Sequence, residues 1–320
     1  IGSVSKALTA ATVIHRAERL DSVSLDDPFR DFLPRRWKSE LHASLRPVTL
    51  RHLLQHRSGF AHSGKTLWGH SYNMRERLKL GAETYIVQAE NIAKGESKSL
   101  PVPVDVRSYA NASFGLWNVS AASLTPAKWR TVEDGFQPGE ITYDSYLNVH
   151  AYRLYRDTVT SVLFDPVGVT GGCNVYTNPT HAAFTYSDRD TANGVNRANP
   201  GRTCAVGGWF MSTHALTKVI HRVVATRDVI DENHDKMFVA NKNRLVFASN
   251  LTVSGGRAVA HNGSRWNGAA KAEVIVFPNG YVAAALVNSK ATGEASSLRA
   301  TLTAAFNAAM APSRASLSAQ

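Results

Sequence analysis

The chain has 320 residues, of which 43% are hydrophobic and 19% are charged, and this composition excludes a disordered, collagen-like or coiled-coil protein. Its length is enough to bury a sizeable core and predicts one large domain or two closely packed ones. The net charge of +11 favours anionic partners. Lysines and arginines are scattered, however, and the densest cluster, Arg35, Arg36 and Lys38, is short, so we expect a solvated basic surface and no nucleic-acid partner.

The beginning of the chain predicts two helices. Residues 3–19 predict a helix buried among neighbours, because Ser3 is a favoured N-cap residue and the alanine-rich stretch after it is apolar on most sides. Residues 49–56 predict a second, short helix that is stopped by Ser58 and Gly59.

The middle of the chain mixes helices with loops. Apolar residues at helical spacing predict a helix over 143–164, which Asp165 and Pro166 end. Residues 170–205 are rich in Asn, Thr, Gly and Pro and predict long surface loops. Residues 213–226 predict a further helix.

The last third changes character and predicts an antiparallel sheet followed by a helix. Pro278-Asn279-Gly280 separates two β-prone runs and is typical of a hairpin turn. A final amphipathic helix is predicted over 296–310, with Leu298, Leu302 and Phe306 on its apolar face. The β-prone runs are 244–247, 258–261, 273–277 and 281–287.

The two cysteines, Cys173 and Cys204, are too few for a disulfide scaffold, and no Cys/His cluster indicates zinc. They form either one disulfide, which an oxidising compartment permits, or two buried thiols. Both lie beside glycines in loop-like sequence, which favours the disulfide. No apolar run is long enough to span a membrane. No signal peptide is visible, and because the chain begins with Ile1 we interpret it as a fragment cut at its N-terminus.

The first candidate for chemistry is the pair Ser3 and Lys6, which share one face of the first helical turn. The serine hydroxyl there lies near the positive end of the helix dipole, which favours developing negative charge. A lysine one turn away can take the serine proton if burial lowers its pKa. Taken alone, an N-cap serine followed by a surface lysine is the simpler explanation.

Two further elements carry candidate residues. A tyrosine beside a lysine can be pushed towards phenolate and serve as base or proton relay, and Tyr109 is followed by Asn111, which can hold a substrate amide. His261-Asn262-Gly263 ends a β-prone run, and a glycine on a strand lets a substrate backbone approach closely. Each element alone is equally consistent with a core tyrosine or a plain turn.

In this order, the three elements resemble the pattern of penicillin-recognising serine enzymes, S-x-x-K, then Y-x-N, then a basic-x-Gly element near a C-terminal sheet. The surrounding sequence is similar to the class C β-lactamase family. Residues 49–60 resemble its TLRHLLTHTSGL helix, and residues 109–115 resemble its YSNASFG stretch. The matching segments are 1–6, 49–60, 109–115, 163–169, 207–213, and 261–263 with 288–289.

The resemblance implies an α/β (α+β) fold of the β-lactamase/DD-peptidase type, in which an antiparallel sheet flanked by helices packs beside a mostly helical region. It implies that residues 1–320 form a single catalytic domain. The helical region is expected over 20–235, and the sheet region over 236–320 together with the 3–19 helix. The family's leading helix and strands are missing from this chain.

The resemblance also implies roles for individual residues. Ser3 attacks a carbonyl, Lys6 and Tyr109 share the proton transfers, and Asn111 orients the substrate. The backbone N–H groups of Ser3 and Ser264 form the oxyanion hole, and one such donor is typically worth about 3–4 kcal/mol of transition-state stabilisation.

The third element departs from the family pattern. His261 and Asn262 are expected to line the edge strand against which the acyl group lies, but class C β-lactamases carry Lys-Thr-Gly at this point, and histidine is a weaker cation at neutral pH. His-x-Gly is instead familiar among the family's DD-peptidases, D-amino-acid peptidases and esterases. The lead into Tyr109 is also altered, at residues 103–106.

We therefore expect a serine hydrolase that works through an acyl-enzyme on an ester or amide, as a D-amino-acid peptidase or a carboxylesterase. The alternatives are a class C-type β-lactamase and a non-hydrolysing penicillin-binding sensor or scaffold. No cofactor is expected, and the substrate is a small molecule or peptide, with peptidoglycan-related peptides among the candidates. The basic surface and the cysteine pair favour an extracytoplasmic location, either periplasmic or secreted.

Other motifs are set aside. His52 and His56 have the spacing of a zinc-binding pair, but Leu53 replaces the glutamate of that motif and no third ligand is evident, so no metal is expected. Asn118-Val119-Ser120 matches a glycosylation sequon, which matters only in a eukaryotic secretory route. The absence of a nucleophile-elbow or P-loop motif disfavours an α/β-hydrolase or a nucleotide-binding enzyme.

Overall fold

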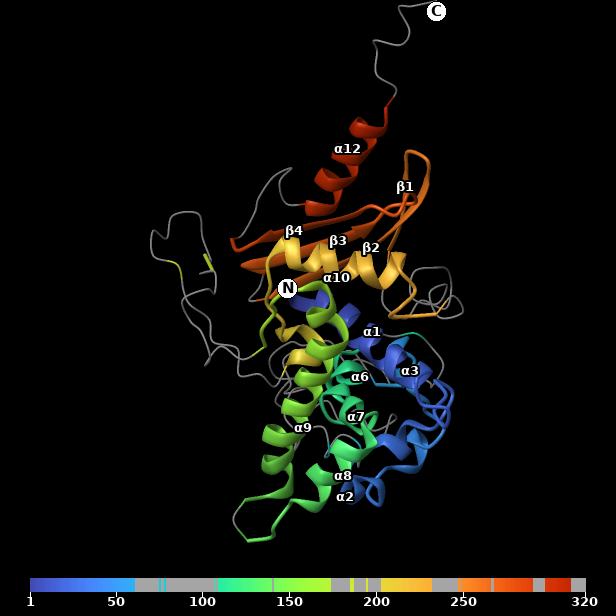
Figure 1. Ribbon diagram of the computed structural model, residues 1–320, viewed down its shortest axis with the longest axis vertical. Helices are drawn as coiled ribbons and strands as arrows, with labels where there is room; N and C mark the ends of the chain where they lie inside the picture. Colours follow the sequence, from blue (N-terminus) through green and yellow to red (C-terminus); the bar gives the residue numbers. More distant parts are fainter. Residues whose placement is uncertain are drawn as a thin grey trace, which may run out of the picture.

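A computed structural model of the chain describes residues 1–60, 75, 78, 107, 109–139, 141–173, 185–186, 194, 203–231, 247, 249–265, 268–289 and 297–311. An antiparallel sheet lies between helix α12 (Leu298–Met310) on one side and helices α1 (Ser5–Glu18) and α10 (Thr213–Ala225) on the other (Figure 1). The remaining helices gather beyond α1, on the side away from α12. The molecule therefore has a sheet part and a helical part, with α1 between them.

The N-terminal segment starts with the 3-10 turn η1 (Gly2–Val4), which leads directly into α1. The helix predicted over 3–19 is confirmed to within a few residues at each end. The N-cap role predicted for Ser3 is wrong, since the N-cap of α1 is Val4 and no side chain caps the helix. The Ser3 hydroxyl bonds to Tyr109 and Lys6 instead of to the helix backbone.

Helix α3 (Leu50–Leu54) is held by a capping box, in which Thr49 Oγ1 accepts from the His52 N–H and His52 Nδ1 accepts from the Thr49 N–H. The helix ends before His56, whose φ of 58° lies in the left-handed region. His52 and His56 therefore do not share one helical face, and the zinc-pair interpretation remains set aside. Three short helices precede α3, namely η2 (Phe29–Phe32), α2 (Arg35–Lys38) and η3 (Ala43–Leu45).

After α3, the described residues of the helical part up to Val167 form four α-helices and two shorter turns. Thr142 caps the longest helix by accepting from the Ser145 N–H, and the helix predicted over 143–164 is confirmed, although its last turn is π-helical. These elements are α6 (Asn111–Gly115), α7 (Trp117–Ser123), α8 (Pro126–Asp134), α9 (Tyr143–Val159), η4 (Thr160–Phe164) and η5 (Asp165–Val167).

Two elements connect the helical part to the sheet part. A π-helical turn, η8 (Cys204–Gly208), packs against η1 and α1. Helix α10 follows it and is capped by Ser212, whose hydroxyl accepts from the Ala215 N–H at 3.1 Å. Figure 1 shows α10 running across the face of the sheet near β4. The helix predicted over 213–226 is confirmed.

The sheet has the strand order β1-β2-β3-β4, and all neighbours are antiparallel. β1 pairs only with the first half of β2, up to Ala260. Among the described residues, the second half of β2 (261–265) is therefore paired with β3 alone. The strands are β1 (Ser249–Val253), β2 (Gly256–Arg265), β3 (Ala270–Val276) and β4 (Val282–Val287).

Three of the four β-prone runs fall in β2, β3 and β4, as predicted. The hairpin turn is also confirmed, because Gly280 has φ 83° and its N–H donates to the Phe277 carbonyl at 3.0 Å. The run at 244–247 lies outside the described residues except for Phe247, and most of the loop region predicted over 170–205 lies outside them as well.

The sheet separates two apolar clusters. The large cluster fills the space around α1 and the helical part and reaches the inner face of the sheet at Ala272 and Val274. The small cluster lies between the outer face and α12, and Ile275 and Phe306 belong to it. Alternate residues of β3 therefore face opposite cores, as the two-residue repeat of a strand requires.

The fold expected from the sequence, an antiparallel sheet flanked by helices with a mostly helical region beside it, is confirmed. Within the described part of the chain, no helix has the length and apolar character needed to cross a bilayer.

Candidate active site

Ser3, Lys6 and Tyr109 meet at the start of α1. The Ser3 Oγ lies 2.9 Å from the Tyr109 Oη and 3.0 Å from the Lys6 Nζ, both within hydrogen-bond distance. Tyr109 comes from the segment just before α6, so the contact joins residues that are 106 positions apart in the chain. The structure therefore brings the serine, the amine and the phenol into one cluster.

Lys6 is fully buried, and its Nζ also donates to the Val206 carbonyl at 2.8 Å. The amine lies 5.1 Å from the ring centroid of Tyr109 and 5.8 Å from that of Phe114. Burial disfavours the charged ammonium and holds the pKa of Lys6 well below its ordinary value. A neutral amine within reach of a serine hydroxyl is able to accept its proton.

Tyr109 has the opposite shift. Burial raises the pKa of its hydroxyl, and the hydrogen bond to Ser3 only partly offsets that rise. This direction does not favour the phenolate that a neighbouring lysine was expected to promote, because burial disfavours both a charged amine at Lys6 and a phenolate at Tyr109. The environment favours Lys6 as the proton acceptor and a neutral Tyr109 as a hydrogen-bonding relay.

His56 packs beneath Tyr109, with the two ring centroids 4.5 Å apart. Its Nδ1 lies 3.1 Å from the Ala110 carbonyl oxygen and 3.2 Å from the Ala110 nitrogen, so either tautomer finds a partner there. Burial is the main cause that holds the pKa of His56 well below its ordinary value. A neutral imidazole thus supports the Tyr109-Ala110 backbone.

Two glycines allow β2 to approach η1 closely. A Cβ on Gly263 would lie 2.2 Å from the Ile1 carbonyl oxygen and 2.8 Å from the Ser3 nitrogen. A Cβ on Gly2, which has φ +55°, would lie 2.8 Å from the Ser264 nitrogen. Because the Ile1, Ser3 and Ser264 atoms in these contacts belong to the backbone and cannot move aside as a flexible side chain can, no side chain fits at Gly2 or at Gly263. The contact brings the amide nitrogens of Ser3 and Ser264 to the same junction.

His261 lies under this junction. Its ring is 4% exposed, and its Nε2 lies 2.9 Å from the Ser3 carbonyl oxygen, which accepts a hydrogen bond from it. Asn262 is exposed on the opposite face, where it pairs in register with Glu273. Both residues lie in the half of β2 that is paired with β3 alone among the described residues, and the two-residue repeat of the strand sends the His261 side chain inward and the Asn262 side chain to the outer face.

Asn111 is the first residue of α6 and lies two positions after Tyr109. Its Oδ1 is buried and has no hydrogen-bond partner among the described residues. A buried amide oxygen without a partner is unfavourable, so this atom is available to a ligand group.

Comparisons with known proteins identify the fold. Residues 1–122 match the family model named Beta-lactamase. A class C β-lactamase from Rhodobacter sphaeroides superimposes with a TM-score of 0.62 at 18% identity, over 95% of this chain and 83% of that one. The penicillin-binding protein from Bacillus halodurans gives a TM-score of 0.60 at 16% identity, over 96% and 86%. This chain has the β-lactamase fold.

The match of residues 1–122 and the shared fold agree with the resemblance to the serine β-lactamase and DD-peptidase family that the sequence shows. A structure of SurE with D-Leu shares the β-lactamase fold, with a TM-score of 0.54 and 20% identity over 97% of this chain. The chain spans 62% of the length of SurE. A search of curated proteins found no matching sequence.

In this β-lactamase-fold chain, Cys173 and Cys204 are joined in a disulfide. Cys204 is the first residue of η8, the turn whose Val206 carbonyl accepts from Lys6 and whose Gly207 lies against Gly2. The disulfide therefore ties down the segment that touches both η1 and the Lys6 amine.

Sequence reasoning missed several groups around the cluster. Val206 acts through its backbone carbonyl, which no side-chain pattern reveals. Thr9 and Asn118 are fully buried, and both bond to the backbone of Ala205, the residue before Val206. The signal that could have found them is a polar residue inside an otherwise apolar helix, since such a side chain needs a buried partner. His56 was considered only as a metal ligand.

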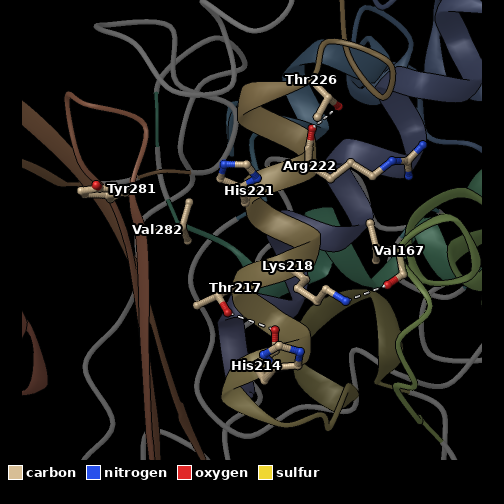
Figure 2. A pocket seen from close by; sticks show the side chains of 9 residues that line it. All are labelled: Val167, His214, Thr217, Lys218, His221, Arg222, Thr226, Tyr281 and Val282. Carbon is tan, nitrogen blue, oxygen red and sulfur yellow. Dashed lines mark hydrogen bonds between the residues drawn. The ribbon is translucent and has the colours of Figure 1, made fainter.

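A separate hollow runs along α10 and the start of β4, with a volume of about 530 Å³ (Figure 2). Figure 2 shows Lys218 reaching towards the Val167 carbonyl, on the far side of the helix from Tyr281. None of the predicted site residues lines it. Within the described ranges, no group of three or more His, Cys, Asp or Glu side chains could hold a metal ion.

Proposed function

We propose that this β-lactamase-fold chain is a serine hydrolase that forms an acyl-enzyme on Ser3 with an ester or amide substrate. One observation carries the proposal: the Ser3 Oγ is within hydrogen-bond distance of both the Lys6 Nζ and the Tyr109 Oη. A nucleophile that contacts a base and a relay is the arrangement that covalent acyl transfer needs. Residues 1–320 would then act as one catalytic domain.

In acylation, the Ser3 oxygen would attack the substrate carbonyl carbon while its proton passes to the neutral Lys6 amine. The negative charge that forms on the carbonyl oxygen would be stabilised by the N–H groups of Ser3 and Ser264, which meet at the junction of η1 and β2. Collapse of this intermediate breaks the bond to the leaving alcohol or amine, which takes a proton from Lys6 through the Tyr109 hydroxyl. The product is an ester on Ser3, and Lys6 is neutral again.

In deacylation, a water molecule would attack the Ser3 ester and give up a proton to the same Lys6–Tyr109 pair. Breakdown of the second intermediate would return that proton to the Ser3 oxygen and release the carboxylic acid. Asn111 would hold an amide or ester group of the substrate through its buried Oδ1.

For the substrate, we propose an ester or a D-amino-acid amide, as expected for a D-amino-acid peptidase or carboxylesterase. His261 bonds to the Ser3 carbonyl from beneath, so it offers no exposed cation for the carboxylate of a β-lactam. The fold is shared with a protein whose structure holds D-Leu and with a penicillin-binding protein. An extracytoplasmic location and peptidoglycan-related peptides fit this proposal.

The test uses the whole chain and a Ser3→Ala variant. We expect a fluorophosphonate to label Ser3, detected by mass spectrometry, and p-nitrophenyl butyrate or a D-Ala-D-Ala peptide to be hydrolysed by the wild type only. Hydrolysis of nitrocefin as the fastest reaction would instead indicate a β-lactamase, and a stable penicillin adduct without turnover would indicate a sensor. Absence of any Ser3 adduct would reject the proposal.

A further inference from the structure

The position of the Lys6 amine depends on a backbone carbonyl. For Lys6 to take the Ser3 proton, its lone pair has to point at the Ser3 Oγ, 3.0 Å away. The Val206 carbonyl, 2.8 Å from the same nitrogen, can only accept a hydrogen bond, so it fixes where one N–H points. A shift of this carbonyl would therefore turn the lone pair away from the serine.

Val206 lies in η8, a turn with an unusual internal bonding pattern. The Thr203 carbonyl accepts from three successive N–H groups, those of Val206, Gly207 and Gly208, at 3.0, 2.8 and 2.8 Å. One carbonyl shared among three donors leaves the turn weakly held by its own backbone, so the direction of the Val206 carbonyl depends on contacts made by other elements.

The peptide groups on either side of Ala205 supply those contacts. Thr9 Oγ1, from α1, lies 2.8 Å from the Ala205 carbonyl and bonds to it. The Ala205 N–H donates to Asn118 Oδ1, from α7, at 3.1 Å. Thr9 and Asn118 are both fully buried. We call these two bonds the Ala205 clamp.

The Ala205 clamp connects the elements that carry the reacting groups. Thr9 lies on α1 with Lys6, less than one turn further along, and its Oγ1 also lies 2.8 Å from the Tyr155 Oη. Asn118 Nδ2 donates to the Gly115 carbonyl at the end of α6, the helix that starts with Asn111. The clamp therefore joins the Ser3–Lys6 helix and the Tyr109–Asn111 segment to the turn between them.

We propose that Thr9 and Asn118 are positioning residues for proton transfer from Ser3, because they fix the Val206 carbonyl that directs the Lys6 amine. This inference rests on the proposed function and adds two residues to it that touch neither substrate nor nucleophile. Packing alone does not readily explain why two buried polar side chains bond to the backbone of one residue, Ala205, since apolar residues of the same size would fill that space without needing partners.

The chain offers a matched control for each residue. Thr12 lies on α1 three positions after Thr9, and Ser120 lies on α7 two positions after Asn118. Both are fully buried, and their hydroxyls have no hydrogen-bond partner among the described residues. Thr9→Val and Thr12→Val thus make the same volume-conserving change on one helix, but only the first removes a clamp bond.

The experiment measures hydrolysis of p-nitrophenyl butyrate well below the unfolding temperature of each variant. We expect Thr9→Val and Asn118→Leu to lower kcat by about 10–100-fold with KM nearly unchanged, because a misdirected amine slows the chemical step and leaves substrate binding intact. Thr12→Val and Ser120→Ala should keep wild-type kcat. Thr9→Ser, which retains the hydroxyl, should restore most of the lost rate.

The outcomes separate the two proposals. If the wild type shows neither hydrolysis nor a Ser3 adduct, the proposed function fails. If the wild type is active and Thr9→Val matches Thr12→Val in kcat, the inference about the Ala205 clamp is overturned. A kcat loss in Thr9→Val that Thr9→Ser does not rescue would also overturn it. If Thr9→Val does not fold, the comparison of Asn118→Leu with Ser120→Ala decides the question.

Discussion

Helices α1 and α12 pack on opposite faces of the same sheet, and they are buried in different ways. α1 is enclosed on nearly all sides and carries four fully buried polar residues, Ser5, Lys6, Thr9 and Thr12. The only buried residue of α12 is Phe306, which stacks on Phe277 with ring centroids 3.9 Å apart. The outer helix is thus attached by one buried aromatic ring and by partly exposed polar contacts such as Arg299–Glu273, whereas the inner helix keeps polar groups away from water.

The difference shows that the unfavourable burial of polar side chains is concentrated on α1. A buried amine is destabilising unless its partners compensate for lost hydration, and the partners of Lys6 are a serine hydroxyl and one carbonyl. Lys6 contacts Ser3 and the Val206 carbonyl, and Thr9 bonds to the Ala205 carbonyl, so these two polar groups of α1 are directed to the candidate site and to η8. Substitutions on α1 should therefore separate activity from stability, and substitutions on α12 should change stability alone.

The largest effect is expected at Lys6. Lys6→Met should lower kcat/KM for an ester by about 10²–10⁴-fold, because the proton acceptor is lost. The variant should nevertheless unfold at a higher temperature. Because burial lowers the pKa of Lys6, the folded protein holds this proton less tightly than the unfolded chain, and this difference disfavours folding of the wild type at pH values below the ordinary lysine pKa.

The sign of this stability gain can be checked by pH. Below the ordinary lysine pKa of 10.5 the unfolded wild type gains a proton, and wild-type stability falls as pH falls. Lys6→Met has no lysine at this position and does not lose stability in this way. The melting temperature of Lys6→Met should therefore exceed that of the wild type by more near pH 7 than at about pH 10. An equal advantage at both values would mean that Lys6 is charged in the folded protein.

The second prediction concerns the apolar attachment of α12. Phe306→Ala should reduce the free energy of unfolding by about 3 kcal/mol, since it removes the ring that stacks on Phe277. Urea unfolding measures this change, and kcat of the folded fraction should stay at the wild-type value. Met310→Ala is the control on the same helix, because Met310 is 44% exposed and should change stability little.

A smaller effect is expected at the ion pair that joins α12 to β3. Arg299 donates from its Nε to the buried Glu273 carboxylate at 2.9 Å. Arg299→Met should reduce stability by roughly 1–3 kcal/mol, less than for a fully buried pair because the arginine is partly exposed. The double variant Arg299→Met with Glu273→Leu should recover most of that loss.

This last effect should also depend on pH. Burial raises the pKa of Glu273, and Arg299 opposes that rise, so removing the arginine leaves an ionised carboxylate even harder to bury. The destabilisation by Arg299→Met should be largest near neutral pH and should shrink as pH falls towards the ordinary value of 4.5, where the unfolded glutamate is protonated as well. A loss that grows at low pH would contradict this account.

Much of the fold could be predicted from the sequence because its patterns are local. Helical spacing over 143–164, the turn at 278–280 and the apolar face with Phe306 each depend on neighbours in the chain. The N-cap role of Ser3 was wrong because a distant residue, Tyr109, competes for the same hydroxyl. The N-cap propensity of a serine depends on its neighbours in the chain and takes no account of a partner about a hundred positions away.

The candidate site was only partly predictable for the same reason. Ser3, Lys6 and Tyr109 were chosen by type and order, and the structure brings them together. The protonation states were not predictable, since they depend on how deeply Lys6 and Tyr109 are buried. His261 was expected beside the substrate, but the register of β2 against η1 directs its ring beneath Ser3.

The close contact between Gly2 and Gly263 provides a criterion for classifying related sequences. Any side chain at 263 would collide with the Ile1 carbonyl and separate the strand from the nucleophile turn. A relative may exchange His261 or Asn262 and still keep the two amide nitrogens side by side. A relative with a bulkier residue in place of Gly263 must hold its serine in a different geometry, whatever the rest of its motif suggests.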